Sequence, residues 1–146
     1  MTDFAHIACF IDGSDAAGRA MAQADALRAL SGGRLSVVHV VASPSFLVSL
    51  AAGLGGGAVH DPEIEREAAG MWLDEQVRDR AGATAVLLEG HPASEACAWA
   101  AAEGVDVMVA ASHRGLVERA LLGSFASHIA HHGPCPVLLV PPREDS

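Results

Sequence analysis

The stretch HIACFIDGS, residues 6–14, decides the fold. Its apolar first part, His6–Ile11, predicts a β-strand. Ser14 then offers an N-cap, and an alanine-rich run to about Leu30, closed by Gly32–Gly33, predicts a helix. The residues expected on the buried face of this helix are Ala20, Ala24 and Leu27. A strand, a turn and a helix thus follow one another directly.

The same alternation of β-branched and helical runs continues along the chain. Further strands are predicted at Leu35–Val41, Ala85–Glu89, Val105–Ala110 and Pro136–Val140. Further helices are predicted to begin at Asp61–Pro62, Pro92 and Gly123–Ser124, the last ending at Gly133–Pro134. The order βαβαβαβαβ predicts an α/β fold with one parallel sheet, helices on both faces and right-handed crossovers.

The two middle helices carry apolar residues at helical spacing. Asp61 is expected to cap the first of them, with Pro62 at its first position and Gly82 at its end. Its expected buried stripe is Ile64, Ala68, Met71 and Trp72. The stripe of the next helix, which Gly104 follows, is Ala96, Trp99 and Ala100.

The length of 146 residues suits one domain, and no second domain or internal repeat is visible. Two segments stand apart: the apolar, glycine-rich loop Ser43–His60 and the tail Pro141–Ser146, which we expect to be frayed. Loops beyond ~12–15 residues are usually lids or disordered segments. No charged residue lies between Arg34 and Asp61, but His39, a proline and several glycines interrupt the stretch, which argues against a membrane helix.

The net charge of −9 and the absence of lysine exclude several function classes. An acidic chain repels phosphate backbones and anionic membranes, so we expect neither as a partner. Without lysine there is no P-loop lysine and no Schiff base. Cys9, Cys97 and Cys135 are odd in number and form no CxxC, which predicts reduced thiols. Together with an N-terminus unlike a secretory signal, they point to the cytoplasm.

Ligands of open parallel sheets bind beyond the carboxyl ends of the strands, where the strand order reverses. Asp12 follows the first strand there, and its carboxylate can accept hydrogen bonds from a ribose or an amino group. The alternative is that Asp12 caps the following helix, and both roles can coexist. We interpret Ser14 as a cap.

Gly123–Ser124 begins the last helix, where unpaired N–H groups and the helix dipole attract an anion such as phosphate. The alternative is an ordinary turn with Ser124 as N-cap. In the preceding loop, Ser112, His113 and Arg114 either face that anion or are solvated.

Other histidines have simpler interpretations. His128 and His132 are four residues apart, a spacing that can hold a metal, but the sequence places no third ligand nearby. We therefore assign no metal site. His39 lies within a strand and is expected to be a satisfied core or edge residue. No Ser-His-Asp order and no G-x-S-x-G motif appears, so no catalytic residue is assigned.

An ordered set of motifs covers nearly the whole chain. FIDGS at 10–14 resembles a strand-one V-D-G-S ending, VVHV at 37–40 resembles L-x-H-V, and EGHPA at 89–93 resembles G-x-P-x. The remaining matches are Gly104–Val109, Glu118–Ser124 and Pro134–Val140. Each motif alone is weakly specific, but the ordered set resembles the universal stress protein family.

The resemblance implies a Rossmann-like, adenine nucleotide α-hydrolase-like sheet in the order 3-2-1-4-5 and a homodimer paired through the strand at Val137–Val140. In nucleotide-binding members, the aspartate after strand one and the backbone after strand two hold adenosine, and a G-x-x-G-x(9)-G-S/T loop holds the phosphates. The positions that this resemblance marks for ATP or AMP, with Mg²⁺ as an accompanying ion, are Asp12, Val40, Ala111, His113, Arg114, Gly115, Gly123, Ser124 and Phe125.

The start of the phosphate motif departs from the family pattern. Ala111 stands where the first glycine belongs, the second glycine is missing after Ser112–His113, and the loop is one residue short. Arg114 or Gly115 fills the space. Because a displacement of about 1 Å matters for positioning, this change puts the phosphate contacts in question.

Three functions follow in order of preference. The first is an adenine-nucleotide-binding stress regulator with the Ser43–His60 loop as a lid. The second is a nucleotide-free dimeric interaction module of the same fold, in which that loop docks a protein. The third is a slow ATP hydrolase, for which only His113 or Asp12 offers a base. A response-regulator receiver is excluded because the chain has Glu89–Gly90 after the third strand and no lysine.

Overall fold

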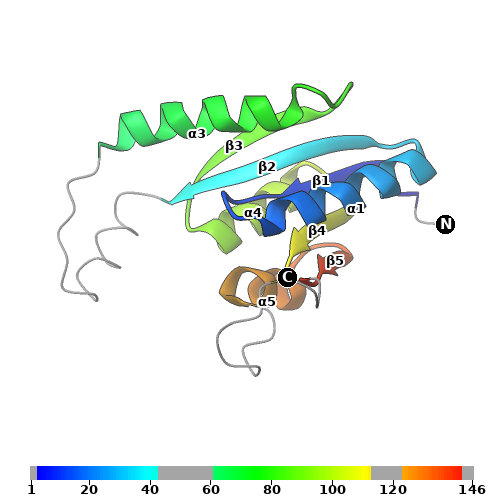
Figure 1. Ribbon diagram of the computed structural model, residues 1–146. Coiled ribbons are helices and arrows are strands. Elements are labelled where there is room, and N and C mark those ends of the chain that lie inside the picture. Colours follow the sequence, from blue (N-terminus) through cyan, green and yellow to red (C-terminus); the bar gives the residue numbers. More distant parts are fainter. Residues whose placement is uncertain (1–2, 43–60, 113–122, 143–146) are drawn as a thin grey trace.

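A computed structural model describes residues 3–42, 61–112 and 123–142. Its five strands pair in parallel in the order β3-β2-β1-β4-β5, as predicted (Figure 1). The strands are β1 (His6–Phe10), β2 (Arg34–Ala42), β3 (Thr84–Gly90), β4 (Val107–Ala111) and β5 (Val137–Val140). The helices are α1 (Ala16–Ser31), α3 (Pro62–Val77), α4 (Pro92–Ala102) and α5 (Gly123–His132).

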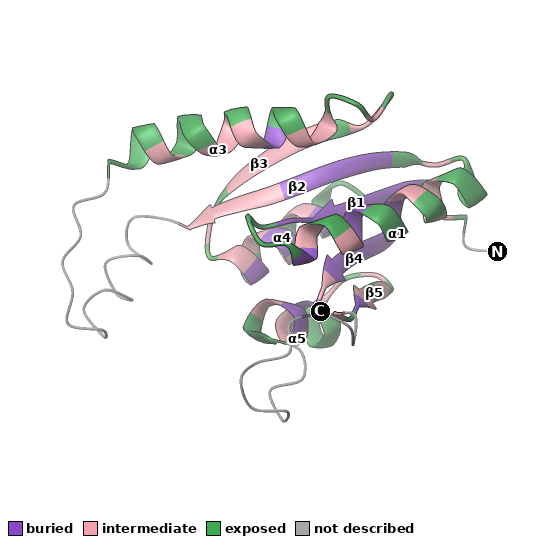
Figure 2. Cartoon of the chain, viewed as in Figure 1, coloured by how far each residue is buried: buried purple, intermediate pink, exposed green. Residues whose placement is uncertain are grey.

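The helices cover both faces of the sheet. Side chains of α1 and α3 share one buried cluster with alternate residues of the strands, and side chains of α4 and α5 share the other. Strand β1 serves both clusters, because successive side chains of a strand point to opposite faces. It is buried along its whole length (Figure 2).

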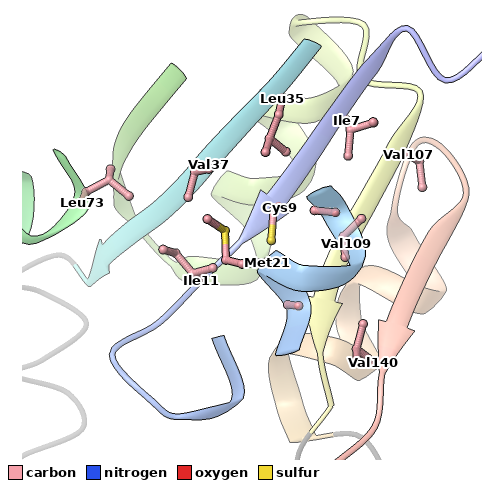
Figure 3. Packing of buried hydrophobic residues seen from close by; sticks show 12 residues of the cluster. Ile7, Cys9, Ile11, Met21, Leu35, Val37, Leu73, Val107, Val109 and Val140 are labelled. Carbon is pink, nitrogen blue, oxygen red and sulfur yellow. The ribbon is translucent and has the colours of Figure 1, made fainter. Parts of the chain in front are cut away.

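The cluster on the α1/α3 face is aliphatic and sulfur-containing. Ile7 and Cys9 of β1 and Ile11, which directly follows it, alternate along the chain and meet Met21 of α1 and Val37 of β2 (Figure 3). Ala20 and Ala24 are buried as predicted, and Leu27 is half-buried against the same cluster. Small residues on α1 let the helix lie close to the sheet.

Sequence signals for helix ends are confirmed at two sites. Gly32 follows α1 in the left-handed conformation with φ 71°, and its N–H donates to the Arg28 carbonyl. Asp61 caps α3 by accepting from the Glu63 N–H at 3.0 Å, with Pro62 in the first turn. Glycine reaches the left-handed conformation without steric cost, and the aspartate satisfies a donor that the helix leaves unpaired.

The predicted buried stripe of α3 is wrong. Ile64 and Met71 are 64% and 69% exposed, Ala68 is also exposed, and only Trp72 of the four is half-buried. The residue of α3 that is fully buried is Leu73. The helix bears apolar residues on two neighbouring sides, so periodicity alone did not select the side that packs against β2 and β3 (Figure 2).

Several predicted boundaries also differ from the structure. Helix α3 ends at Val77 rather than near Gly82, which instead lies in the following turn with φ 77°. Strand β4 begins at Val107 rather than Val105, because the Val105 N–H donates to the Ala100 carbonyl at the end of α4. The predictions for the Ser43–His60 loop and for residues 143–146 of the tail lie outside the described residues. Within the described ranges, no helix has the length and hydropathy that a membrane span requires.

Candidate functional site

A cavity of about 390 Å³ opens at the carboxyl ends of the central strands. It lies beside β1 and β4, where the chain order along the sheet reverses, the usual ligand position in open parallel sheets. Its volume is within the ~300–1,000 Å³ typical of small-molecule sites. Six of the nine candidate residues line it: Asp12, Val40, Ala111, Gly123, Ser124 and Phe125.

The other three candidates, His113, Arg114 and Gly115, lie outside the described residues. Ser112, which precedes them, does not face an anion. Its side chain is buried, its N–H donates to the Val140 carbonyl at 2.9 Å, and its hydroxyl lies 3.5 Å from the same oxygen. Ser112 therefore holds the end of β4 against β5, and the expectation that it could contact a ligand is wrong.

Asp12 and Ser14 form a small hydrogen-bonded turn between β1 and α1. One carboxylate oxygen of Asp12 accepts from the Ser14 N–H at 2.9 Å and also from the Ser14 hydroxyl. The N-cap of α1 is Asp15, which makes no side-chain capping bond. The prediction that Ser14 caps α1 is thus wrong, because its hydroxyl is engaged by Asp12. The turn holds the Asp12 carboxylate at the cavity wall.

His39 anchors the end of β1 from the neighbouring strand. Its Nδ1 lies 2.8 Å from the Ile11 carbonyl oxygen, and its ring meets Trp72 of α3 edge-on at 5.0 Å between ring centres. Because a carbonyl only accepts, Nδ1 is the donor. The prediction of a satisfied histidine is confirmed. His39 also lines the cavity, so it fixes the backbone immediately before Asp12.

Strand β2 extends beyond the end of β1 at the cavity. The last bond between the two strands runs from the Ile11 N–H to the Val38 carbonyl at 2.9 Å, whereas β2 continues to Ala42. In a parallel ladder, the N–H and C=O of one residue point to the same neighbouring strand, and residues two apart point the same way. The backbone of Val40 therefore points to the side where β1 has ended, toward the cavity that Val40 lines.

The first turn of α5 forms the opposite wall. The first four N–H groups of an α-helix have no acceptor within the helix, and here the four residues that carry them all line the cavity: Gly123, Ser124, Phe125 and Ala126. Gly123 has φ 72°, a left-handed conformation that glycine adopts without strain. These donors and the helix dipole make the wall attractive to an anion.

The cavity also has an apolar wall, of which the sequence analysis named Phe125 but missed Phe10. Phe10 and Phe125 lie 6.0 Å apart between ring centres, and both line the cavity. The further lining residues are Ile11, Ala17, Val38, His39, Pro92, Ala110 and Ala126. Their signal in the sequence is their place in the chain. Ile11, Val38, His39 and Ala110 lie toward the carboxyl ends of predicted strands, and Ala17, Pro92 and Ala126 lie in the first turns of the helices.

The cysteines add no nucleophile to this site. All three thiols are free, as predicted. Burial raises the pKa of Cys9 to about 12 and raises the pKa of Cys97 and of Cys135. Because the thiolate is the reactive form, these side chains behave as small apolar residues.

Comparison with known proteins agrees with the motifs. The universal stress protein family model matches residues 3–141. A universal stress protein of Thermus aquaticus is 34% identical over 138 residues, which cover 88% of this chain and 93% of that protein. A shorter match, 43% identical over 56 residues, covers 38% of this chain and 38% of a universal stress protein of Methanothermobacter thermautotrophicus.

Solved structures share the fold at lower identity. A universal stress protein crystallised in complex with cAMP has a TM-score of 0.70 at 17% identity, covering 94% of this chain and 97% of that one. An Arabidopsis thaliana universal stress protein family protein with AMP bound has a TM-score of 0.64 at 17% identity, covering 97% and 94%. The family model and the full-length relative together show that the chain belongs to the universal stress protein family.

Proposed function

We propose that this protein binds an adenine nucleotide, ATP or AMP, in the cavity between β1, β4 and α5, as a regulatory module of the stress response. The observation that carries the proposal is that one cavity joins a carboxylate, a strand edge and the open N-terminus of a helix. Two relatives of the same fold bind cAMP and AMP. A nucleotide needs contacts of each of these three kinds.

Each part of the ligand has a matching wall. The backbone of Val40 offers a donor and an acceptor to the edge of the base, and Asp12 offers a carboxylate to the ribose hydroxyls. The phosphates meet the N–H groups of Gly123 and Ser124. With a triphosphate, Mg²⁺ would be held chiefly by phosphate oxygens, because it keeps its octahedral oxygen shell.

Calorimetric titration with AMP, ATP and Mg-ATP tests this proposal. We expect saturable binding that Asp12→Ala weakens by about tenfold or more, because a hydrogen bond to a charged group contributes about 1.5–3 kcal/mol. Ser94→Ala is the matched control, since Ser94 is exposed on α4 and does not line the cavity. The absence of a binding heat with all three ligands at millimolar concentration would rule out nucleotide binding.

A nucleotide-free interaction module is the second candidate, favoured by one feature. Ala111 lines the cavity at the place of the first glycine of the phosphate motif. The discriminating measurement is the adenine absorbance of the purified protein together with the shift of its melting temperature on adding nucleotide. The absence of both supports the module.

We also propose that the protein acts in the cytoplasm as a homodimer paired through β5. This strand is at one edge of the sheet, and Leu138 on it is 39% exposed. An open edge with an apolar side chain favours pairing with a second copy. Light scattering should give twice the chain mass for the wild type and one chain mass for Leu138→Arg. A monomeric wild type would contradict the proposal.

A further inference from the structure

Helix α3 carries an apolar stripe that the described part of the chain leaves uncovered. Ile64 and Met71 are 64% and 69% exposed, and Ala68 between them is also exposed. At about 100° and 1.5 Å per residue, these three side chains fall within about 60° around the helix and extend about 10 Å along it. Round the helix from the stripe, past the half-buried Trp72, lies Leu73, which packs against the strands. The stripe is therefore separate from the contact that holds α3 on the sheet.

The first two turns of α3 have little packing of their own. From Pro62 to Ala68, Glu65 is half-buried and the other residues are exposed (Figure 2). An ion pair between Arg66 and Glu89 joins this part of the helix to the end of β3. The buried and most of the half-buried residues of α3 follow from Ala69 onward. This exposed start leaves space for another segment to lie along the stripe.

The spacing of the stripe is that of a coiled-coil seam. In a heptad repeat labelled a to g, positions a and d face the partner helix, and positions e and g flank them. Ile64 and Met71 are seven residues apart and occupy d, while Ala68 and Glu75 occupy a. Apolar residues at this spacing are the anchors by which one helix recognises another. The stripe thus fits a helix rather than an extended segment.

The charges beside the seam indicate the kind of helix. The two g positions are Glu67 and Asp74, and Glu75 adds a third exposed carboxylate at an a position. Arg78 lies past the last turn of α3, beyond the apolar part of the seam. In a parallel pair of two copies Glu75 would face itself, and in an antiparallel pair Glu67 would lie near Asp74. Like charges at these positions disfavour a second copy and favour a basic partner.

We propose that Ile64, Ala68 and Met71 dock a basic amphipathic helix of a partner protein, with apolar residues at its a and d positions and lysine or arginine beside them. The carboxylates that flank the stripe complement the basic residues of that helix. The net charge of −9 adds long-range attraction for such a partner. The surface is distinct from the nucleotide cavity, since none of the described residues that line the cavity belongs to α3.

Fluorescence anisotropy with labelled three-heptad peptides tests the proposal. The first peptide has leucine at a and d and lysine at e and g. The second has the same composition in scrambled order, and the third has glutamate in place of lysine. We expect one equivalent of the lysine peptide to bind, the scrambled peptide to bind about tenfold more weakly or less, and the glutamate peptide not to bind. Equal binding of the first two peptides would show attraction by charge alone and would overturn the docking surface.

Substitutions on the stripe locate the binding. Ile64→Ser and Met71→Ser should each weaken binding of the lysine peptide by about tenfold, because each removes an apolar side chain from the contact. Leu30→Ser is the matched control, since Leu30 is 86% exposed but lies on α1, and it should leave the affinity unchanged. Unchanged affinity in both stripe variants would contradict the proposal.

A charge exchange gives a readout that a loss of folding cannot imitate. Glu67→Lys combined with Asp74→Lys should weaken binding of the lysine peptide and create binding of the glutamate peptide. An unaltered preference for the lysine peptide would overturn the role of the two carboxylates. Light scattering tests the other occupant: if Ile64→Ser lowers the mass of the wild-type assembly, a second copy covers the stripe and the proposal of a partner helix is wrong.

Discussion

The two faces of the sheet are packed with different side chains. The buried cluster under α1 and α3 consists of aliphatic and sulfur-containing residues, and the rings that pack against it, Phe4 and Trp72, are partly buried. Under α4 and α5, Phe10 lies 6.2 Å from Trp99 and 6.0 Å from Phe125 between ring centres. The cavity borders both clusters, since Ile11 and Ala17 line it from the aliphatic side and Phe10 and Phe125 from the aromatic side.

The difference shows how one strand can serve two faces that are packed with different side chains. Ile7 and Cys9 of β1 point into the aliphatic cluster, and Ala8 and Phe10 point into the other. The alanines Ala96 and Ala100 let α4 approach the sheet closely, and the larger rings lie around them. The contrast between the aliphatic face and the aromatic face can be tested by substitution.

The largest effect is expected at Leu73, the one residue by which α3 is fully anchored to the aliphatic face. Leu73→Ala should lower the free energy of unfolding by about 2–5 kcal/mol, since it removes buried methyl groups and leaves a void. Met71→Ala is the control, because Met71 is 69% exposed and should change stability by no more than about 0.5 kcal/mol. Urea denaturation gives both values. Equal losses of unfolding free energy in the two variants would show that Met71 is buried, as the periodicity predicted.

Two glycines with open space around them should respond in opposite directions. Gly123 at the cavity has φ 72°, so Gly123→Ala should cost about 1–2 kcal/mol from backbone strain. Gly18 is helical in α1, and Gly18→Ala should stabilise the protein by about 0.5–1 kcal/mol. Thermal unfolding compares them. A stabilising Gly123→Ala would contradict the left-handed start of α5.

A buried histidine on the aromatic face should make stability depend on pH. Burial, aided by the charge of Arg34, lowers the pKa of His6, whose Nε2 lies 2.8 Å from the Ser36 hydroxyl. The unfolded chain protonates His6 below about pH 6.5, before the folded chain does, so stability is present above that pH and is lost as the pH falls toward the lower folded pKa.

His6→Gln removes this titration while keeping a partner for Ser36. Between about pH 7.5 and about pH 5.5, chemical denaturation should show a smaller loss of stability in His6→Gln than in the wild type. The exposed His131→Gln variant is the control, and its loss of stability between these two pH values should equal that of the wild type. Parallel losses in all three proteins would show that His6 does not contribute.

The smallest effect is expected at the ion pair that joins α1 to the turn after α3. The Arg80 guanidinium lies 3.0 Å from the Asp25 carboxylate, and both side chains are partly exposed. A double-mutant cycle with Asp25→Asn and Arg80→Gln should give a coupling of about 0.2–1 kcal/mol that falls with added salt. A coupling that does not respond to salt would contradict this.

The sequence predicted the residues of the site that have a local or motif signal, but not the contacts that depend on how the helices pack on the sheet. Asp12 follows a strand, Val40 lies near the end of one and Gly123 begins a helix. Family motifs mark these positions, so they were named from the sequence. The packing of Phe10 against Phe125 depends on the angle at which α5 crosses the sheet, which no local pattern records. The sequence also did not predict that the Ser14 hydroxyl donates to Asp12 instead of capping α1, because a serine at that position suits both roles.

The sequence by itself determined the alternation of strands and helices, the parallel sheet and the caps at Gly32 and Asp61, because these depend on neighbouring residues and on hydrophobic spacing. Only the tertiary structure decided which side of α3 is buried. It also decided that His91 at the start of α4 lies 6.4 Å from His128 of α5 between ring centres. Which face of a helix is buried depends on the segments that pack against it. Because those segments are distant in the sequence, the sequence of one helix does not determine its buried face.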